Sequence, residues 1–195
     1  MKKQTILALA IASILTVAAA NPAMAYVLLS PRRTWATVPV TVKVFTGGNS
    51  TIVDGSGGVT AVVASIKAWG VVNSSTSATK AVRGTAPATI ELNSNGKICT
   101  GSCLAATLTG YYTGNTIYDA DVYTNTRYSY TSSRETDGCS GEYDIDGIMV
   151  HEVGHVIGLG HSNVAGATMY PSVSSCNINN RTLEADDLAA KNDLY

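Results

Sequence analysis

One short segment constrains this chain more than any other feature of its sequence. Residues 151–161 read His-Glu-Val-Gly-His-Val-Ile-Gly-Leu-Gly-His. In a helix, His151 and His155 are four residues apart and share one face, so both imidazoles can reach one metal ion. Gly158 allows the helix to end and the chain to turn sharply, which returns His161 to the same ion from outside the helix. The segment therefore predicts a helix, a helix-terminating turn and a three-histidine metal site.

The donor set indicates which metal binds and what chemistry it supports. Three imidazoles with an open fourth position are typical of catalytic zinc, whereas structural zinc sites are closed by four protein ligands. Glu152 follows the first ligand, and we expect it to act as general base on a zinc-activated water and then to protonate a leaving amine. All three histidines of the chain lie in this segment, so none is left for a second, structural zinc site. The alternative is an ordinary helix with unrelated histidines, which the spacing disfavours.

Hydrophobic patterning around this segment predicts an α+β chain. Expected strands, inferred from alternating or short apolar runs, are residues 38–45, 88–93, 104–112 and 116–123, the last two joined at Gly114-Asn115 as a hairpin. Expected helices, inferred from helical spacing of apolar residues, are residues 59–72, 144–159 and 183–195. Asp144 and Thr182 are the expected N-caps of the last two helices. The Ser/Thr-rich residues 73–86 are expected to be a loop.

The first 25 residues have the pattern of a secretory signal peptide. Two lysines precede an apolar stretch over residues 6–20, and Ala23-Met24-Ala25 is a small-residue cleavage site. That stretch is short for a membrane span of about 20 residues, although an uncleaved anchor is the alternative. We expect residues 26–195 to form a single domain, with an N-terminal subdomain to about residue 158 and a small C-terminal subdomain over residues 159–195. We expect it to be secreted, with the periplasm as the alternative compartment and no membrane association after cleavage.

The charge balance excludes a basic nucleic-acid-binding surface. The chain has 13 Lys and Arg against 14 Asp and Glu, and its formal net charge is −1. Only 14% of its residues are charged while 45% are hydrophobic, which favours a folded chain over a disordered one. We expect a monomer whose partner is a protein or peptide substrate.

The four cysteines of an exported chain predict two disulfides. Four cysteines allow three pairings. We favour Cys99–Cys103, because these two flank a tight loop that contains glycine, and Cys139–Cys176 as the remaining pair. A zinc-binding thiol is the alternative, and the lack of a C-x-x-C pair argues against it.

The residues that follow the third histidine resemble those of a known family. Residues 161–171 read His-Ser-Asn-Val-Ala-Gly-Ala-Thr-Met-Tyr-Pro, and the whole pattern is similar to metzincin metallopeptidases, most of all to the matrixin group. Residues 117–122 and 183–195 resemble the strand and final helix of bacterial matrixin-like proteins. The resemblance implies a metzincin-like zincin fold: a twisted mixed β-sheet, a long active-site helix, a Met-turn and a C-terminal helix. It also implies that Met169, in the Met-turn, forms a hydrophobic floor beneath the zinc.

The same resemblance implies a secreted zinc metalloendopeptidase. Two alternatives on this fold are a non-catalytic zinc-containing binding protein and a hydrolase of non-peptide amides. A binding protein would have no need of Glu152, and the matrixin-like Met-turn disfavours the second alternative. In this family the pocket for the substrate residue after the scissile bond lies beside the zinc. We expect Gly147 and Val173 to leave that pocket roomy and apolar.

Calcium is a second candidate cation because related enzymes often bind it. Four aspartates offer the hard oxygen atoms that calcium prefers, namely Asp119, Asp121, Asp144 and Asp146. Residues 144–147 lack the rest of an EF-hand loop, and helix capping already explains Asp144. We therefore assign calcium no ligands from the sequence.

Overall fold

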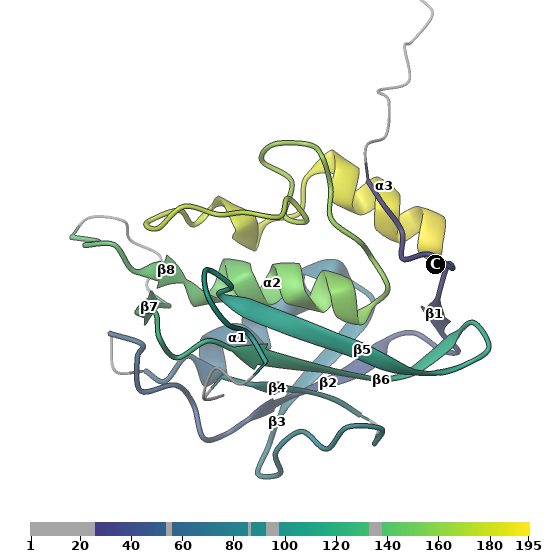
Figure 1. Ribbon diagram of the computed structural model, residues 1–195, viewed down its shortest axis with the longest axis horizontal. Coiled ribbons are helices and arrows are strands. Elements are labelled where there is room, and N and C mark those ends of the chain that lie inside the picture. The colour runs from purple at the N-terminus through teal and green to yellow at the C-terminus, as the bar shows by residue number, and fades with distance from the viewer. Residues whose placement is uncertain (1–25, 54–55, 86, 93–97, 133–137) are drawn as a thin grey trace, which may run out of the picture.

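The computed structural model describes residues 26–195 except 54–55, 86, 93–97 and 133–137 (Figure 1). The expected signal peptide lies outside these described residues. Among the helices that are described, none combines the length and apolar character needed to cross a membrane.

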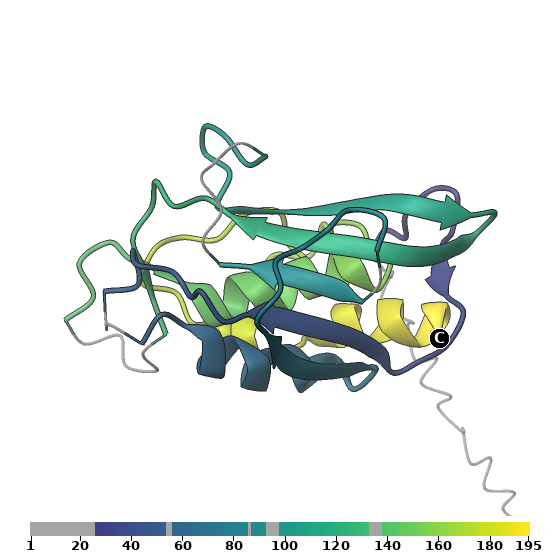
Figure 2. The same ribbon diagram turned by 90° about the horizontal axis from the view of Figure 1, so that it is seen from below.

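A mixed six-stranded sheet supports the rest of the fold (Figures 1 and 2). Its strands are β1 (Thr34–Trp35), β2 (Val40–Phe45), β3 (Val72–Ser77), β4 (Ala88–Glu91), β5 (Ala105–Thr113) and β6 (Thr116–Thr124). They follow the order β1-β6-β4-β2-β3, and β5 pairs with β6. All pairings are parallel except the antiparallel β5–β6 hairpin, which the Gly114-Asn115 signal predicted. Two short strands, β7 (Tyr130–Thr131) and β8 (Tyr143–Asp144), form a separate parallel ladder.

Alternation of apolar and polar residues predicts strand β2 correctly but does not reveal strand β3. In β2, Val40, Val42 and Val44 are buried on one face, as the alternating pattern predicted. The expected loop over residues 73–86 is wrong at its start, because residues 72–77 form β3. Only Val72 of this strand is buried, so its Ser/Thr-rich sequence shows no hydrophobic alternation. Backbone pairing with β2 along the whole of β3 makes it a strand.

The first helical segment is shorter than expected. It consists of α1 (Val59–Ser65) and the 3₁₀ turn η1 (Ile66–Trp69), whereas the apolar spacing predicted a helix to residue 72. Gly70 ends the turn in the left-handed region, with φ of 69°, which glycine adopts without steric cost. The apolar positions Val62, Ile66 and Trp69 are fully buried, as expected of a core-facing stripe.

The central helix, α2 (Ile145–Val156), begins where the sequence predicted. The Asp144 side chain accepts a hydrogen bond from the Gly147 amide at 2.9 Å and so caps the first turn. Its apolar residues Met149, Val153 and Val156 are fully buried. The helix packs against β5, β6 and α1, and Figure 1 shows it lying along the sheet with the C-terminal segment on its other side.

The last helix, α3 (Ala185–Leu194), follows the short turn η2 (Asn179–Arg181). The expected N-cap, Thr182, is wrong: its hydroxyl donates to the Asn179 carbonyl at 3.1 Å, and the residue is the C-cap of η2. Glu184 caps α3 instead, in a capping box with Asp187. The helix therefore begins two residues later than expected.

Both expected disulfides are present. The structure pairs Cys99 with Cys103 and Cys139 with Cys176. No cysteine among the described residues is free, which excludes a zinc-binding thiol there. The second bridge joins the segment before β8 to the segment after the Met-turn, so it braces the chain on both sides of α2.

Candidate metal centre

Two turns of α2 carry the first two predicted ligands. The Nδ1 atom of His151 lies 2.7 Å from the Thr168 carbonyl oxygen, and that of His155 lies 2.8 Å from the Leu159 carbonyl oxygen. A carbonyl oxygen can only accept, so each Nδ1 carries the proton and each Nε2 presents a lone pair. Such carbonyl partners orient metal-binding histidines in known sites.

The turn after α2 brings the third histidine to the other two. Gly158 has φ of 107°, and a Cβ atom there would lie 2.4 Å from the Arg33 carbonyl oxygen, so only glycine fits. The chain makes this turn directly after α2, which ends at Val156. Beyond the turn, the Nε2 atom of His161 lies 3.2 Å from the Nε2 atom of His155.

The three histidines fit a zinc ion. Their candidate ligand atoms all lie within 4.8 Å of one another. Zinc–nitrogen bonds of 2.0–2.1 Å in a tetrahedral site separate two nitrogens by about 3.3 Å, close to the observed His155–His161 spacing. Burial lowers the pKa of both His151 and His155 to about 4, so both are neutral at neutral pH, the form that binds metal.

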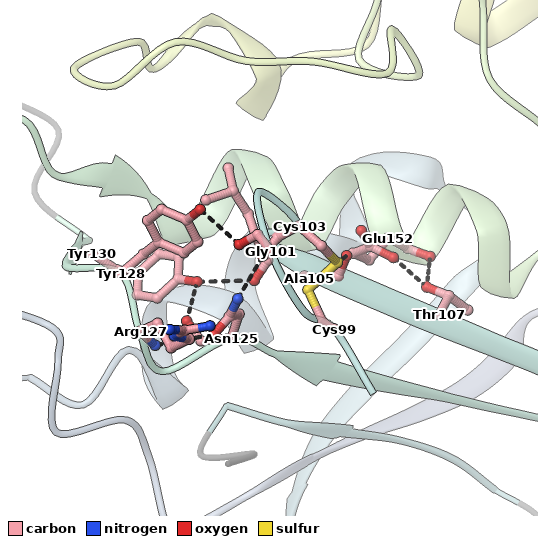
Figure 3. Close-up of a disulfide and its surroundings, with 11 residues drawn as sticks. Cys99, Gly101, Cys103, Ala105, Thr107, Asn125, Arg127, Tyr128, Tyr130 and Glu152 are labelled. Carbon is pink, nitrogen blue, oxygen red and sulfur yellow. Dashed lines mark hydrogen bonds between the residues drawn. A yellow bond between two sulfur atoms is a disulfide. The ribbon is translucent and has the colours of Figure 1, made fainter. Parts of the chain in front are cut away.

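Glu152 lies beside the histidines at the wall of a cleft. Its side chain is buried, and together with His151 and His161 it lines this cleft. Its Oε2 atom accepts a hydrogen bond from the Thr107 hydroxyl of β5 at 2.6 Å (Figure 3). Burial raises the pKa of the carboxyl group. Nothing in the sequence indicated Thr107, because it is 45 residues away and lies in an ordinary strand.

The Met-turn packs against α2. Met169 is buried, and a Cβ atom on Gly154 would lie 2.2 Å from its sulfur, so Met169 contacts α2 between the two helical histidines. The carboxylate of Asp187 accepts the amide hydrogens of Thr168 and Met169 at 2.8 and 2.9 Å. Asp187 thus supports the Met-turn from α3, a role that the sequence analysis missed.

The cleft beside the histidines has a volume of about 590 Å³. Its walls come from the Cys99–Cys103 loop with the start of β5, from α2 and from the segment after the Met-turn, and they include Leu104, Tyr143, Ile148 and Val173. The expectation for Gly147 is wrong, because this residue does not line the cleft. A Cβ atom there would lie 3.1 Å from the Cβ atom of Asn180, so η2 occupies the space beside it.

The four aspartates considered for calcium have two different surroundings. Asp144 and Asp146 form ion pairs with Arg181, at 2.5 and 3.6 Å. Asp119 accepts the Gly84 amide at 2.6 Å, and Asp121 accepts the Thr89 amide at 3.1 Å. Among the described residues, no three carboxylates bring ligand atoms within 4.8 Å of one another. The structure therefore assigns calcium no ligands.

A family comparison matches the part of the chain that contains this centre. Residues 90–195, more than half of the chain, match the sequence profile of the Matrixin family. The matched range includes β5, β6, α2, the Met-turn and α3.

Individual relatives come from plants, animals and bacteria. The chain is 44% identical over 54 residues to Metalloendoproteinase 4-MMP of Arabidopsis thaliana, which is 27% of this chain and 15% of that protein. It is 37% identical over 60 residues to Matrilysin of Rattus norvegicus, 31% of this chain and 22% of that protein. It is 42% identical over 52 residues to Karilysin of Tannerella forsythia, 27% of this chain and 10% of that protein. The chain therefore matches less than a quarter of each of these relatives.

Proposed function

Because this chain belongs to the matrixin family of zinc metalloendopeptidases, we propose that it is a secreted endopeptidase with one catalytic zinc and with Glu152 as its general base. His151, His155 and His161 are the proposed ligands. The observation that carries the proposal is the convergence of these three imidazoles beside a buried glutamate at the side of one cleft. Proteins or peptides are the substrates that the family implies.

The residues of the site have complementary tasks. When bound, zinc acts as a Lewis acid that lowers the pKa of a water molecule and polarises a carbonyl group. Glu152 accepts the proton of the attacking water and then protonates the leaving amine. Its burial supports this role, because a raised pKa brings a carboxylate closer to the value that a general base needs near neutral pH. Met169 is buried against Gly154, which lies between the two helical histidines in the sequence, and we assign it the apolar floor of the centre.

The cleft supports a preference for an apolar substrate residue after the scissile bond. Leu104, Ile148 and Val173 face the cleft beside His151 and Glu152. Each buried methylene contributes about 0.8 kcal/mol, so kcat/KM should rise from alanine to leucine to phenylalanine at this substrate position. A flat series, or a preference for charged residues, would contradict this part of the proposal.

The proposal also covers the export of the chain and its division into a signal peptide and a catalytic domain. The two disulfides suit an oxidising compartment, which supports a signal peptide over residues 1–25 and extracellular or periplasmic residence. Residues 26–195 then form the catalytic domain, divided near Gly158 into two subdomains. The β-bridge between Leu28 and Leu159 supports the two subdomains forming one domain, because it joins the start of the described chain to the segment just after the active-site helix.

Cleavage of a peptide library tests the proposal. The purified chain is incubated with the library, and the new termini are identified by mass spectrometry. We expect cleavage at internal bonds that a chelator abolishes. Glu152→Gln should lose most of this activity, because an amide cannot take the proton from water. General bases contribute about 10²–10⁴-fold. Zinc uptake without any cleavage by the native chain would instead indicate the non-catalytic binding protein, and cleavage by Glu152→Gln at the native rate would refute the role of Glu152.

A further inference from the structure

Both hydrogen-bond contacts of the Thr107 hydroxyl are with Glu152. Its Oγ1 atom lies 2.6 Å from Oε2 of the carboxylate and 3.0 Å from the main-chain carbonyl oxygen of the same residue. We propose that Thr107 is a positioning residue, which fixes the Glu152 carboxylate in one conformation for proton transfer. This inference rests on the proposed function of Glu152 as general base.

The strand that carries Thr107 is anchored close to α2. Thr107 pairs with Val122 of β6, and β5 packs against α2. Figure 3 shows Thr107 of this strand beside Glu152 of the helix. Just before β5, the Leu104 carbonyl oxygen accepts a hydrogen bond from the Tyr130 hydroxyl at 2.9 Å. The Cys103 carbonyl oxygen accepts one from the Asn125 side chain at 2.8 Å. The disulfide and these two bonds hold the start of the strand in place, so the Thr107 hydroxyl meets Glu152 from a rigid support.

The hydrogen bond adds a specific restraint to a side chain that is already buried. A glutamate has several rotatable bonds and loses substantial rotamer freedom when its carboxylate is fixed. A hydroxyl donating to a carboxylate at this distance is a short, charge-assisted hydrogen bond. Because it engages one oxygen while the residue lines the cleft, it holds the carboxylate at the wall where the substrate binds. Correct placement of a reacting group is itself a large contribution to catalysis.

Removal of the hydroxyl should therefore affect turnover more than binding. Thr107→Val keeps the shape of the side chain and its β-branched character but cannot donate a hydrogen bond. Supporting partners of this kind typically contribute about 10–100-fold, so we expect kcat to fall by that factor with KM nearly unchanged. Thr107→Ser restores the hydroxyl and should recover most of kcat. Thr109→Val makes the same substitution two residues further along β5 and is the matched control, for which we expect a native kcat.

Two measurements apart from activity make the test specific. Zinc content and melting temperature should be the same in Thr107→Val and in the native chain, since the hydroxyl contacts no proposed ligand. Crystal structures of the two proteins should show one Glu152 conformer in the native chain and several in Thr107→Val. Loss of zinc or of the fold in Thr107→Val would overturn the inference, because the hydroxyl would then be structural.

The failure of this inference can be distinguished from failure of the proposed function. If Glu152→Gln keeps native turnover, the proposed general base is wrong, and the positioning role fails with it. If Glu152→Gln is inactive but Thr107→Val has native kcat, only the positioning role is wrong. An equal loss of kcat in Thr107→Val and Thr107→Ser would overturn it as well, because the serine retains the hydroxyl.

Discussion

Arg181 connects the C-terminal segment to the first turn of the helix that bears the histidines through buried ion pairs. Arg181→Met tests how much these ion pairs contribute to the free energy of unfolding. Its Nε and Nη2 atoms donate to the Asp144 carboxylate at 2.9 and 2.5 Å. Its Nη1 atom lies 3.6 Å from Asp146. The arginine side chain is 8% exposed, and the two aspartate side chains are 3% and 4% exposed. The guanidinium therefore neutralises two carboxylates that water cannot reach.

The expected loss of stability follows from this burial. Methionine keeps much of the apolar stem but leaves both carboxylates without their cation. Removal of one partner from a buried ion pair costs about 3–5 kcal/mol. For a domain of this size each kcal/mol lowers the melting temperature by about 2–4 °C, so the expected decrease is about 6–20 °C. Urea denaturation followed by circular dichroism, with both disulfides intact, measures the free energy of unfolding.

A second ion pair in the same chain provides the control. Arg32 contacts Asp193 at 3.6 Å, with side chains 51% and 46% exposed. Solvent screens such a pair, so Arg32→Met should change the free energy of unfolding by less than about 1 kcal/mol. If both substitutions have similar small effects, the reasoning from burial is refuted.

Three further predictions concern the surroundings of the metal centre. Gly154→Ala should destabilise the chain by about 1–3 kcal/mol in urea denaturation, because its Cβ atom would overlap the sulfur of the Met-turn; an unchanged midpoint would show that the turn relaxes freely. Replacement of Cys139 and Cys176 by serine should cost about 3–4 kcal/mol, since the bridge closes a loop with a sequence separation of 37, and an equal denaturation midpoint would exclude this. In the metal-free protein, His151 and His155 have pKa values near 4 against 6.5 in the unfolded chain. Between these two pKa values the unfolded chain binds more protons than the folded chain. The free energy of unfolding should therefore fall as the pH drops from 6.5 towards 4, by about 1.4 kcal/mol per pH unit for each histidine. A free energy of unfolding that does not change with pH over this interval would contradict the burial of the two histidines.

The parts of the fold that were predictable depend on local signals. The start of α2 was predictable because the cap residue Asp144 lies next to the turn that it caps. The convergence of the three histidines was predictable because helix periodicity and one glycine turn bring together residues that are close in sequence. The β5–β6 hairpin was predictable for the same reason, since a two-residue turn joins its strands.

The parts that were missed depend on contacts between distant residues. Thr107 reaches Glu152 across 45 residues, and Arg181 reaches Asp144 across 37. Strand β3 is an edge strand defined by its pairing with β2, not by its own polar sequence. Gly147 was misread because its empty side is filled by Asn180, which only the packed structure places there.

A zinc titration of the metal-free protein tests the central claim most directly. Cleavage of an internally quenched peptide is followed while zinc is added in measured equivalents, for the native chain and for Glu152→Gln. We predict that native activity rises to a plateau at one equivalent, and that Glu152→Gln binds the same single equivalent without cleaving the peptide. Activity that does not depend on zinc, or a Glu152→Gln variant that reaches the native plateau, would contradict a zinc peptidase that uses Glu152 as its base.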